Sequence, residues 1–514
     1  MNEAKYLVGI DLGTSNSAMA YIELAKGAEA PVMDFDIIQQ VRPGEATPLE
    51  LLPSFIYLAG PHEQALQTVN LPWGNDSTAI VGELARWQGA RVPGRLVTSA
   101  KSWLCHSGVD RQAPILPWGA PADVGKISPV QASALLLNHM ASAWNTAHPD
   151  YPLSSQDLVI TVPASFDEVA RALTVKAANQ AGLERFTLLE EPQAAFYDFT
   201  ARHRKDLAML LEGIRLVLVV DVGGGTSDFT LVQCGVSEGG PVLRRIAVGE
   251  HLMLGGDNMD AALSRTVEER MLGAGRRLSM TQWTQLTQAA RLAKEHLLSR
   301  PSKHRRGRKR GSSESAPDHY NLSLIAEGSQ LVGTTLSARI DQAEAERVIL
   351  DGFFPRSGWQ QEPERGNRAA LREVGLPYAQ DPAITRHLAS FLRAHSAAAN
   401  AALGRPADAP GLPRPDAVLL NGGVFNSESI TRRLVEVISA WWPEQEAIPL
   451  LSHDSLDLAV ARGAAFYGLA RRGLGRRIGG GSAHALFVGL EKPGADEPMA
   501  LCVIPRGQEE GEIV

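Results

Sequence analysis

Near the middle of the chain runs the sequence Leu216-Val-Leu-Val-Val-Asp221-Val-Gly-Gly-Gly-Thr226-Ser-Asp228-Phe-Thr-Leu-Val232. The apolar runs on both sides of the glycines predict a buried strand, a tight turn and a second strand. Consecutive glycines leave the main chain bare, and their successive N–H groups can form a nest for an anion. Because Asp221 and Asp228 cannot hold a phosphate themselves, a divalent cation such as hydrated Mg²⁺ is the expected third partner. The stretch therefore indicates a nucleotide-phosphate hairpin; the alternative is a glycine-rich β-turn with incidental acids.

The beginning of the chain repeats this pattern. The sequence Leu7-Val-Gly-Ile-Asp11-Leu-Gly13-Thr14-Ser15-Asn-Ser-Ala-Met-Ala-Tyr21 again predicts strand, turn and strand, with an aspartate at the end of the first strand. One Asp-x-Gly-Thr turn is a weak signal. Two of them in this order indicate a nucleotide held in a cleft between two similar lobes, each of which supplies one phosphate loop.

Composition places the chain among ordinary globular proteins. Its 514 residues suffice for two or more lobes, with 44% hydrophobic and 21% charged residues. The net charge of −7 does not favour binding to nucleic acid or to an acidic membrane. Three widely spaced cysteines, Cys105, Cys234 and Cys502, favour a reducing compartment. We found no apolar run of membrane-spanning length and no signal peptide, so the expected location is the cytoplasm.

Two acids follow a predicted parallel strand. The segment 157–163 predicts a buried strand, Ser165-Phe-Asp-Glu168 predicts a capping box, and the helix that follows runs to Gly182. A second strand then ends at Glu190 and Glu191, which makes a strand–helix–strand crossover. Ligands of open α/β sheets bind at the carboxyl ends of such strands. The two acids are therefore either site residues or compensation for the dipole of the next helix.

Other segments carry weaker signals. Lys101 lies in an apolar helical pattern, where a lysine commonly extends its amine to the surface. The basic segment 303–310 is interpreted as a solvated loop, with nucleic-acid or lipid binding as the alternative. The glycines and arginines of 473–482 predict a linker, and the segments 485–490 and 498–504 predict two short strands.

The motifs in this order resemble the actin-like ATPase domain of the seventy-kilodalton heat-shock (DnaK-type) chaperones. Besides the two hairpins, the matching motifs are Ile160-Thr-Val-Pro-Ala, Glu191-Pro-Gln-Ala-Ala, Leu254-Gly-Gly-Asp-Asn-Met-Asp, Asn421-Gly-Gly-Val-Phe-Asn and Asp457-Leu-Ala-Val-Ala-Arg-Gly-Ala-Ala. The resemblance implies a two-lobed α/β fold with ribonuclease H-like lobes. It implies lobe I in 1–212, completed by about 455–475, and lobe II in 213–454. The remaining segment, 476–514, is a linker with strands that resemble the start of a substrate-binding domain.

The resemblance also implies a role for each matching residue. Lys101 matches the family's catalytic lysine, and Glu191 matches the acid that orders water around the metal. The metal-holding pair is Asp11 and Asp221, with Asp228 close by. The residues that cradle the phosphates are Gly13, Thr14, Ser15, Gly224, Gly225 and Thr226. The residues that line the nucleoside are Gly255, Gly256, Asp257, Lys294, Gly422, Gly423 and Asp457. The cofactors implied are ATP or ADP with Mg²⁺, and K⁺ as an optional addition.

The chain departs from the family pattern in three places. The family clamps adenine between two arginines, and the matching positions here are Glu295 and Asn426. The acidic, leucine-rich interdomain linker is replaced by Gly473-Leu-Gly-Arg-Arg-Ile-Gly-Gly-Gly, and no complete peptide-binding domain follows. These departures predict weaker adenine selectivity and altered coupling between nucleotide and client.

The expected function is slow ATP hydrolysis that controls lobe closure in a chaperone-type protein. Its expected partners are unfolded client proteins and co-chaperones or exchange factors. The first alternative is an actin-like scaffold or filament protein, and the second is a sugar-kinase-like phosphotransferase on the same fold. A P-loop NTPase is unsupported, because the sequence does not contain G-x-x-x-x-G-K-[ST].

Overall fold

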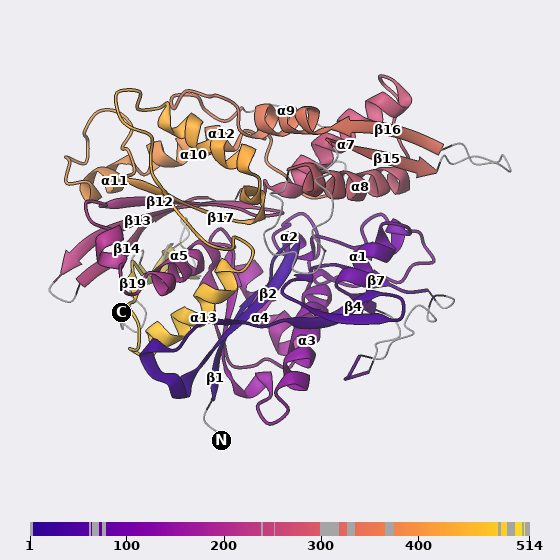
Figure 1. Cartoon of the computed structure of the whole chain (residues 1–514), viewed down its shortest axis with the longest axis horizontal. Coiled ribbons are helices and arrows are strands. Elements are labelled where there is room, and N and C mark those ends of the chain that lie inside the picture. Colours follow the sequence, from indigo (N-terminus) through magenta and orange to yellow (C-terminus); the bar gives the residue numbers. More distant parts are fainter. Residues whose placement is uncertain are drawn as a thin grey trace, which may run out of the picture.

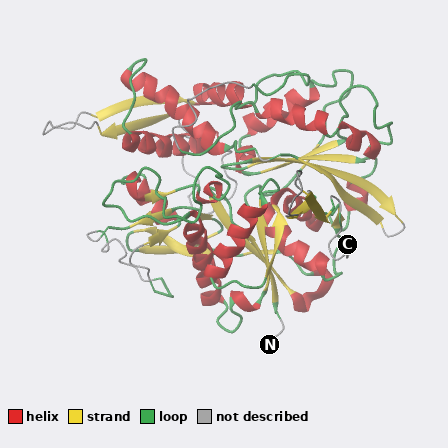
Figure 2. Ribbon diagram, turned by 180° about the vertical axis from the view of Figure 1, so that it is seen from behind, coloured by secondary structure: helices red, strands yellow, loops and turns green. Residues whose placement is uncertain are grey.

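The chain forms two lobes, each built around one sheet (Figure 1). The computed structural model describes residues 4–60, 63, 71–74, 79–237, 240–250, 252–298, 318–325, 335–364, 375–481, 485–490, 499–505 and 508. The basic segment 303–310 lies outside these residues. Helices cover the sheets of both lobes, as the view from behind also shows (Figure 2).

The sheet of lobe I has the strand order β11-β10-β1-β2-β3, and β6 (Leu52–Pro53) pairs with β2 off this path. The strands of this path are β1 (Tyr6–Asp11), β2 (Asn16–Glu23), β3 (Met33–Asp34), β10 (Asp157–Val162) and β11 (Phe186–Glu190). The β1–β2 hairpin is antiparallel, whereas β1 and β10 are parallel, as are β10 and β11. Asp11 and Glu190 therefore both stand at carboxyl ends of parallel strands.

The sheet of lobe II repeats this arrangement. Its order is β18-β17-β12-β13-β14-β19. The strands are β12 (Leu216–Val222), β13 (Ser227–Ser237), β14 (Gly240–Val248), β17 (Ala417–Asn421), β18 (Leu450–Leu451) and β19 (Ile478–Gly479). Again a glycine-containing hairpin, β12–β13, lies beside a strand parallel to its first member, β17. The predicted two-lobed α/β fold is confirmed.

Two helices pack between the sheets. The helix α5 (Glu191–Arg202) contributes Phe196 and Tyr197 to a core shared with Val217 and Val219 of β12. The helix α13 (Ala459–Arg471) packs against both α5 and β1. Glycines allow these close approaches: a Cβ on Gly463 would lie 1.7 Å from the carbonyl oxygen of Ala194 in α5. The small residues of α13 are thus explained by packing.

The other helices and strands of each lobe cover its sheet or extend from it. In lobe I they are β4 (Ile37–Arg42), β5 (Glu45–Leu49), β7 (Ile56–Leu58), β8 (Ala79–Val81), β9 (Leu96–Val97), α1 (Glu83–Gly89), α2 (Ala100–Trp103), α3 (Pro129–Ala147) and α4 (Glu168–Gln180). In lobe II they are α7 (Gly256–Leu272), α8 (Met280–Leu298), β15 (His319–Ile325), β16 (Thr335–Asp341), α9 (Gln342–Phe353), α10 (Ile384–Ala394), α11 (Ser396–Ala402) and α12 (Glu428–Ser439).

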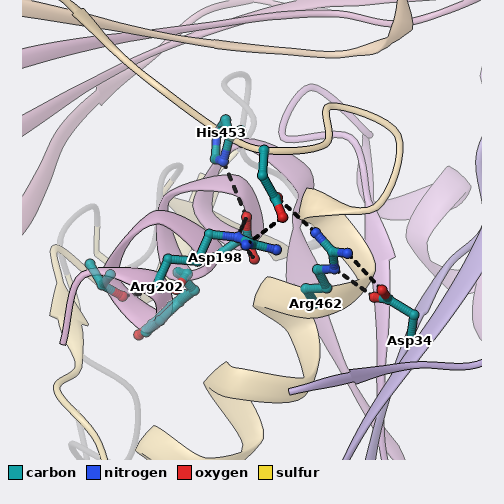
Figure 3. A network of polar contacts seen from close by, with 8 residues as sticks. Asp34, Asp198, Arg202, His453 and Arg462 are labelled. Carbon is teal, nitrogen blue, oxygen red and sulfur yellow. Dashed lines mark hydrogen bonds and ion pairs between the residues drawn. The ribbon is translucent and has the colours of Figure 1, made fainter. Parts of the chain in front are cut away.

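The chain crosses from lobe II back to lobe I through residues 452–458, and a charged network holds this crossover (Figure 3). Arg462 of α13 binds Asp34 of β3 at 2.5 and 2.6 Å and Asp454 of the crossover at 2.8 Å. Arg202 of α5 reaches the same Asp454 at 2.6 Å. The buried side chains of His453 and Asp198 are joined at 3.1 Å. The crossover is therefore fixed to lobe I by side chains on both α5 and α13.

Two local expectations are wrong. The predicted capping box at Ser165 does not form, because Asp167 caps α4 by accepting from the Ala170 N–H, while the Ser165 N–H donates to Asp228. Part of the predicted linker 473–482 also packs on the body. There β19 pairs with β14, and Ile478 is buried.

After the linker, β20 (Leu486–Leu490) and β21 (Met499–Ile504) form an antiparallel hairpin, which agrees with the two predicted strands. Within the described part of the chain, we find no helix that is both long and apolar enough to cross a membrane.

Candidate functional site

A cavity of about 710 Å³ lies between the lobes, which is a usual size for a small-molecule site. Both glycine-containing hairpins contribute to its wall. Of the predicted site residues, those that line it are Asp11, Gly13, Thr14, Ser15, Lys101, Glu191, Asp221, Gly224, Thr226, Gly256, Asp257, Lys294, Glu295, Gly422, Gly423, Asn426 and Asp457. Residues far apart in the sequence thus meet in one space.

Three predicted residues, Gly225, Gly255 and Asp228, are not among the described residues that line the cavity. A Cβ on Gly225 would lie 2.3 Å from Ser102 Oγ, and one on Gly255 would lie 2.6 Å from the oxygen of Gly223. These two glycines therefore allow neighbouring loops to pack closely. Asp228 faces Asp221 across the β12–β13 hairpin and accepts a hydrogen bond from the backbone of Ser165 at 3.1 Å.

We call the part of the cavity around Asp11, Lys101, Glu191 and Asp221 its phosphate end. There the two hairpin turns approach each other directly. A Cβ on Gly224 would lie 2.2 Å from Ser15 Oγ. Lys101, which is 7% exposed, forms an ion pair with Glu191. The lysine therefore extends into the site and not to the surface. Glu190 does not join it, since this side chain pairs with Arg171 at 3.0 Å and with Arg245.

Burial is the main cause of the raised pKa values of the acids at this end of the cavity and beside it. It raises the pKa of Asp11 to about 7, and the charge of Glu191 adds to the effect although Lys101 opposes it. Burial and Glu191 likewise raise the pKa of Asp228 to about 7, and that of Asp221 well above its ordinary value. Burial lowers the pKa of Lys101, but the charges of Glu191 and Asp11 outweigh this and leave it raised. The site is thus rich in acid and short of cations.

This donor set fits a hydrated Mg²⁺. Asp221 is a buried carboxylate and Asp11 a partly buried one, and both face the cavity. Lys101, the cation beside them, is already paired with Glu191. Asn421, at the end of β17, donates to Asp221 at 2.9 Å and leaves its own Oδ1 buried without a partner. Among the described residues, no three acid, histidine or cysteine side chains form a complete metal cage. Mg²⁺ suits such a site, because it keeps several waters and needs only one or two carboxylates.

The nucleoside end of the cavity, which we define by Asp257, Arg291, Lys294, Glu295 and Asn426, is crowded with internal ion pairs. Lys294 binds the carbonyl oxygen of Gly256 at 2.8 Å and Asp260 at 2.6 Å. Arg291, one turn earlier on α8, pairs with Asp257 and Asp260. Its guanidinium is therefore already neutralised within lobe II.

The two positions expected to clamp adenine carry other chemistry. Asn426 donates to both carboxylate oxygens of Asp457, at 3.0 and 3.1 Å. Glu295 lies 3.8 Å from Arg86 of α1, which reaches across from lobe I. Both residues line the cavity, but neither presents a free cation to a base.

Several cavity or supporting residues were not predicted from the sequence. Asn421 stands directly before Gly422 at the end of a buried strand, so the strand-end argument used for Glu190 could have found it. Arg86, Ser99 and Arg291 carry no local signal, because their partners come from elements distant in the chain.

Known proteins resemble this chain over part of its length. The Hsp70 protein family model matches residues 79–319. The chaperone protein HscA homolog of Aliivibrio salmonicida is 31% identical over 281 residues, which are 52% of this chain and 38% of that protein. Chaperone protein HscA of an Enterobacter species is 32% identical over 288 residues, which are 54% of this chain and 40% of that protein. The chaperone protein HscA homolog of Bordetella pertussis is 32% identical over 272 residues, which are 51% of this chain and 37% of that protein.

These matches confirm the predicted relationship over about half of the chain. They cover about two fifths of each relative, so what the whole relatives do is not thereby carried over to this protein. They favour the chaperone-type interpretation over the filament and sugar-kinase interpretations.

Proposed function

We propose that this chain, an Hsp70-family relative over about half of its length, binds Mg-ATP between its lobes and hydrolyses it slowly to ADP and phosphate. One observation carries the proposal: both glycine-containing hairpins, their aspartates and the buried Lys101 line the same cavity. A single loop of this kind would be weak support. Two loops from opposite lobes supply the facing surfaces that a chain of phosphates needs.

The proposed roles follow from position. The main chain and hydroxyl groups of residues 13–15 and 224–226 would hold the β- and γ-phosphates. Asp11 and Asp221 would hold Mg²⁺ through its waters, and the bound Mg²⁺ would supply charge neutralisation. K⁺ is a further proposed cation of the site.

Hydrolysis then depends on placement and charge. Lys101 would face the γ-phosphate and stabilise the negative charge that develops as water attacks in line. Glu191 would orient Lys101 through their ion pair and order the water beside it. Thr226 would contribute its hydroxyl to the terminal phosphate, and Asp228 would support Asp221 from the next strand.

The nucleoside would extend toward lobe II. Gly256, Asp257, Lys294, Gly422, Gly423 and Asp457 are proposed to line it, with Gly255 as packing support. Glu295 and Asn426 take the places of the family's adenine clamp. We therefore propose weaker selectivity for adenine than in relatives that have arginines there.

At the level of the whole chain, we propose that nucleotide state controls closure of lobe I (1–212 with about 455–475) on lobe II (213–454). Residues 476–514 replace the family's acidic linker, so we propose that coupling between nucleotide and client is altered. Unfolded proteins, co-chaperones and exchange factors are the proposed partners, and the cytoplasm is the proposed location.

Single-turnover hydrolysis tests the proposed reaction. Purified chain in excess over radiolabelled ATP should release phosphate slowly with Mg²⁺ and not at all with EDTA. A chain that binds Mg-ATP without releasing phosphate would show that the site is a nucleotide sensor and not an ATPase.

A further inference from the structure

The short helix α2 carries Lys101, yet lobe II holds it on two sides. Lys101 is buried in this helix, and its amine pairs with Glu191. The residue before the helix, Ser99, and the residue that ends it, Trp103, both contact lobe II. The backbone that carries the lysine is therefore held by contacts that cross between the lobes, in addition to the ion pair within lobe I.

The first contact is a buried hydrogen bond. Ser99 Oγ donates to Asp257 Oδ2 at 2.5 Å, and both residues are buried. Arg291 binds the other oxygen of the same carboxylate, so Asp257 is fixed within lobe II. A bond to a charged acceptor in a buried setting is stronger than one between neutral groups.

Ser99 also holds an unfavourable backbone conformation. Its φ is 52° and its ψ is 32°, and among the described residues it is the one non-glycine residue with positive φ. This left-handed conformation costs free energy for any residue with a Cβ. It persists here because the bond to Asp257 and the start of α2 constrain both sides. If the lobes separated, the bond would break and Ser99 could relax.

The second contact is a strap of lobe II, residues 375–379, that crosses to lobe I just before α10. The His106 ring nitrogen Nε2 lies 2.9 Å from the carbonyl oxygen of Gly375, and the His106 ring stacks on Trp103. Gly375 has φ +82°, and a Cβ there would lie 2.5 Å from the Trp118 ring. Leu376 is buried in the core of lobe I together with Trp103.

The strap is anchored in lobe II at its other end. The Ala379 N–H donates to the oxygen of Met253, three residues before α7. Asp381 then accepts from the Ala383 N–H at the start of α10. The strap therefore ties α2 to the same lobe that supplies Asp257.

We propose that Ser99 is a positioning residue for Lys101: its bond to Asp257, with the strap at Trp103, places the lysine amine in the cavity only while the lobes are closed. This inference rests on the proposed function, since it assigns Lys101 to ATP hydrolysis. Hydrolysis would then follow closure and not nucleotide binding as such.

Ser99→Gly tests this directly, because glycine tolerates positive φ and lacks the hydroxyl. We expect the single-turnover rate at saturating enzyme to fall about tenfold, which is about 1.4 kcal/mol of barrier. The Kd for Mg-ATP should stay within about twofold of wild type, because Ser99 is not expected to bind nucleotide. In a Lys101→Ala background, Ser99→Gly should cause no further loss.

A second readout needs no activity. Backbone amides of Ser102 and Leu104 donate to Ser99 and Lys101, so deuterium exchange in 99–106 should quicken in nucleotide-free Ser99→Gly. Exchange in 157–162 of the lobe I sheet should not change. The matched control is Ser133→Ala, which removes a buried hydroxyl bond to Pro129 within α3 and should leave the rate unaffected.

His106→Phe tests the strap, because phenylalanine can keep the stacking on Trp103 and cannot bond to Gly375. A smaller fall in rate, about threefold, is expected.

The inference is overturned if Ser99→Gly has the hydrolysis rate and the deuterium exchange of wild type. It is also overturned if the fall in rate caused by Ser99→Gly adds fully to the fall caused by Lys101→Ala. If wild type itself binds Mg-ATP and releases no phosphate, the proposed function fails, and this inference fails with it.

Discussion

The phosphate end and the nucleoside end of the cavity differ in how their charges are balanced. At the phosphate end, three acids share one lysine, so a bound cation would relieve an excess of acid. At the nucleoside end, Arg291, Lys294, Asp257 and Asp260 already neutralise one another. The first end therefore suits a metal, whereas the second, among the residues that the structure describes, offers a base no unpaired cation. We infer that affinity in this site comes mainly from the phosphates.

The largest expected effect is at Lys101. Lys101→Ala removes the cation that we propose to face the γ-phosphate, so single-turnover hydrolysis should fall by at least about 100-fold. Binding of Mg-ATP should remain within a few fold, since the main-chain loops and Mg²⁺ are retained. Lys176→Ala, at an exposed position on α4, is the control. Equal losses of binding and hydrolysis would remove the catalytic role from Lys101.

The acid surplus at the phosphate end predicts an unusual pH dependence of the nucleotide-free chain. Asp11 and Asp228 have pKa values of about 7 when folded, above their ordinary value of 3.8. A raised folded pKa gives stability that is fully present below pH 4 and is lost as pH rises through about 7. The free energy of unfolding without Mg²⁺ should therefore be lower at pH 8 than at pH 5.5, by about 1 kcal/mol or more for each carboxyl.

Urea denaturation measures this change. Asp228→Asn should reduce the pH dependence and stabilise the chain at pH 8, whereas Asp150→Asn at an exposed position should do neither. A stability that rises between pH 5.5 and pH 8 in Mg²⁺-free buffer would contradict the acid surplus.

The nucleoside end predicts a gain of function on substitution. Glu295→Arg removes a carboxylate from the cavity wall and supplies a cation that can stack on a base. We expect the Kd for Mg-ATP to fall about threefold in Glu295→Arg. In Glu295→Gln, which removes the negative charge without adding a cation, the Kd should fall by a smaller factor. Titration calorimetry of the two variants separates these effects. No change in either variant would mean that the nucleotide does not reach Glu295.

The smallest effect is expected at Arg86, which links the lobes at the cavity mouth. Its partner Glu295 is half-exposed at a distance of 3.8 Å, so water and salt screen the pair. Arg86→Met should speed release of a fluorescent ADP analogue about twofold, and less at high salt. A tenfold change in the release rate would show that this pair is a principal restraint on opening.

How much the sequence predicts also differs between the two ends. At the phosphate end each signal is local, because strand, turn and acid follow one another within a few residues, as at Asp11 and Asp221. At the nucleoside end, the role of a side chain depends on partners that are distant in the sequence. Arg291 is neutralised by α7, and Asn426 is held by Asp457. Only the resemblance assigns Lys101 to the site, since its apolar helical pattern alone favours the surface.

The same reasoning explains the local errors. Ser165 and Asp167 are both good caps, and only the tertiary bond from Ser165 to Asp228 decides between them. The glycines after Gly473 are typical of a linker. Ile478 is nevertheless buried beside β14, and no local sequence pattern indicates this contact.

Titration calorimetry with Mg-ATP, repeated with Mg-GTP and with ATP in EDTA, tests the central claim most directly. If affinity comes mainly from the phosphates and the metal, Mg-ATP and Mg-GTP should bind within about tenfold of each other, and EDTA should abolish both. Strong adenine selectivity that persists without Mg²⁺ would contradict this account, because the nucleoside end would then supply the affinity.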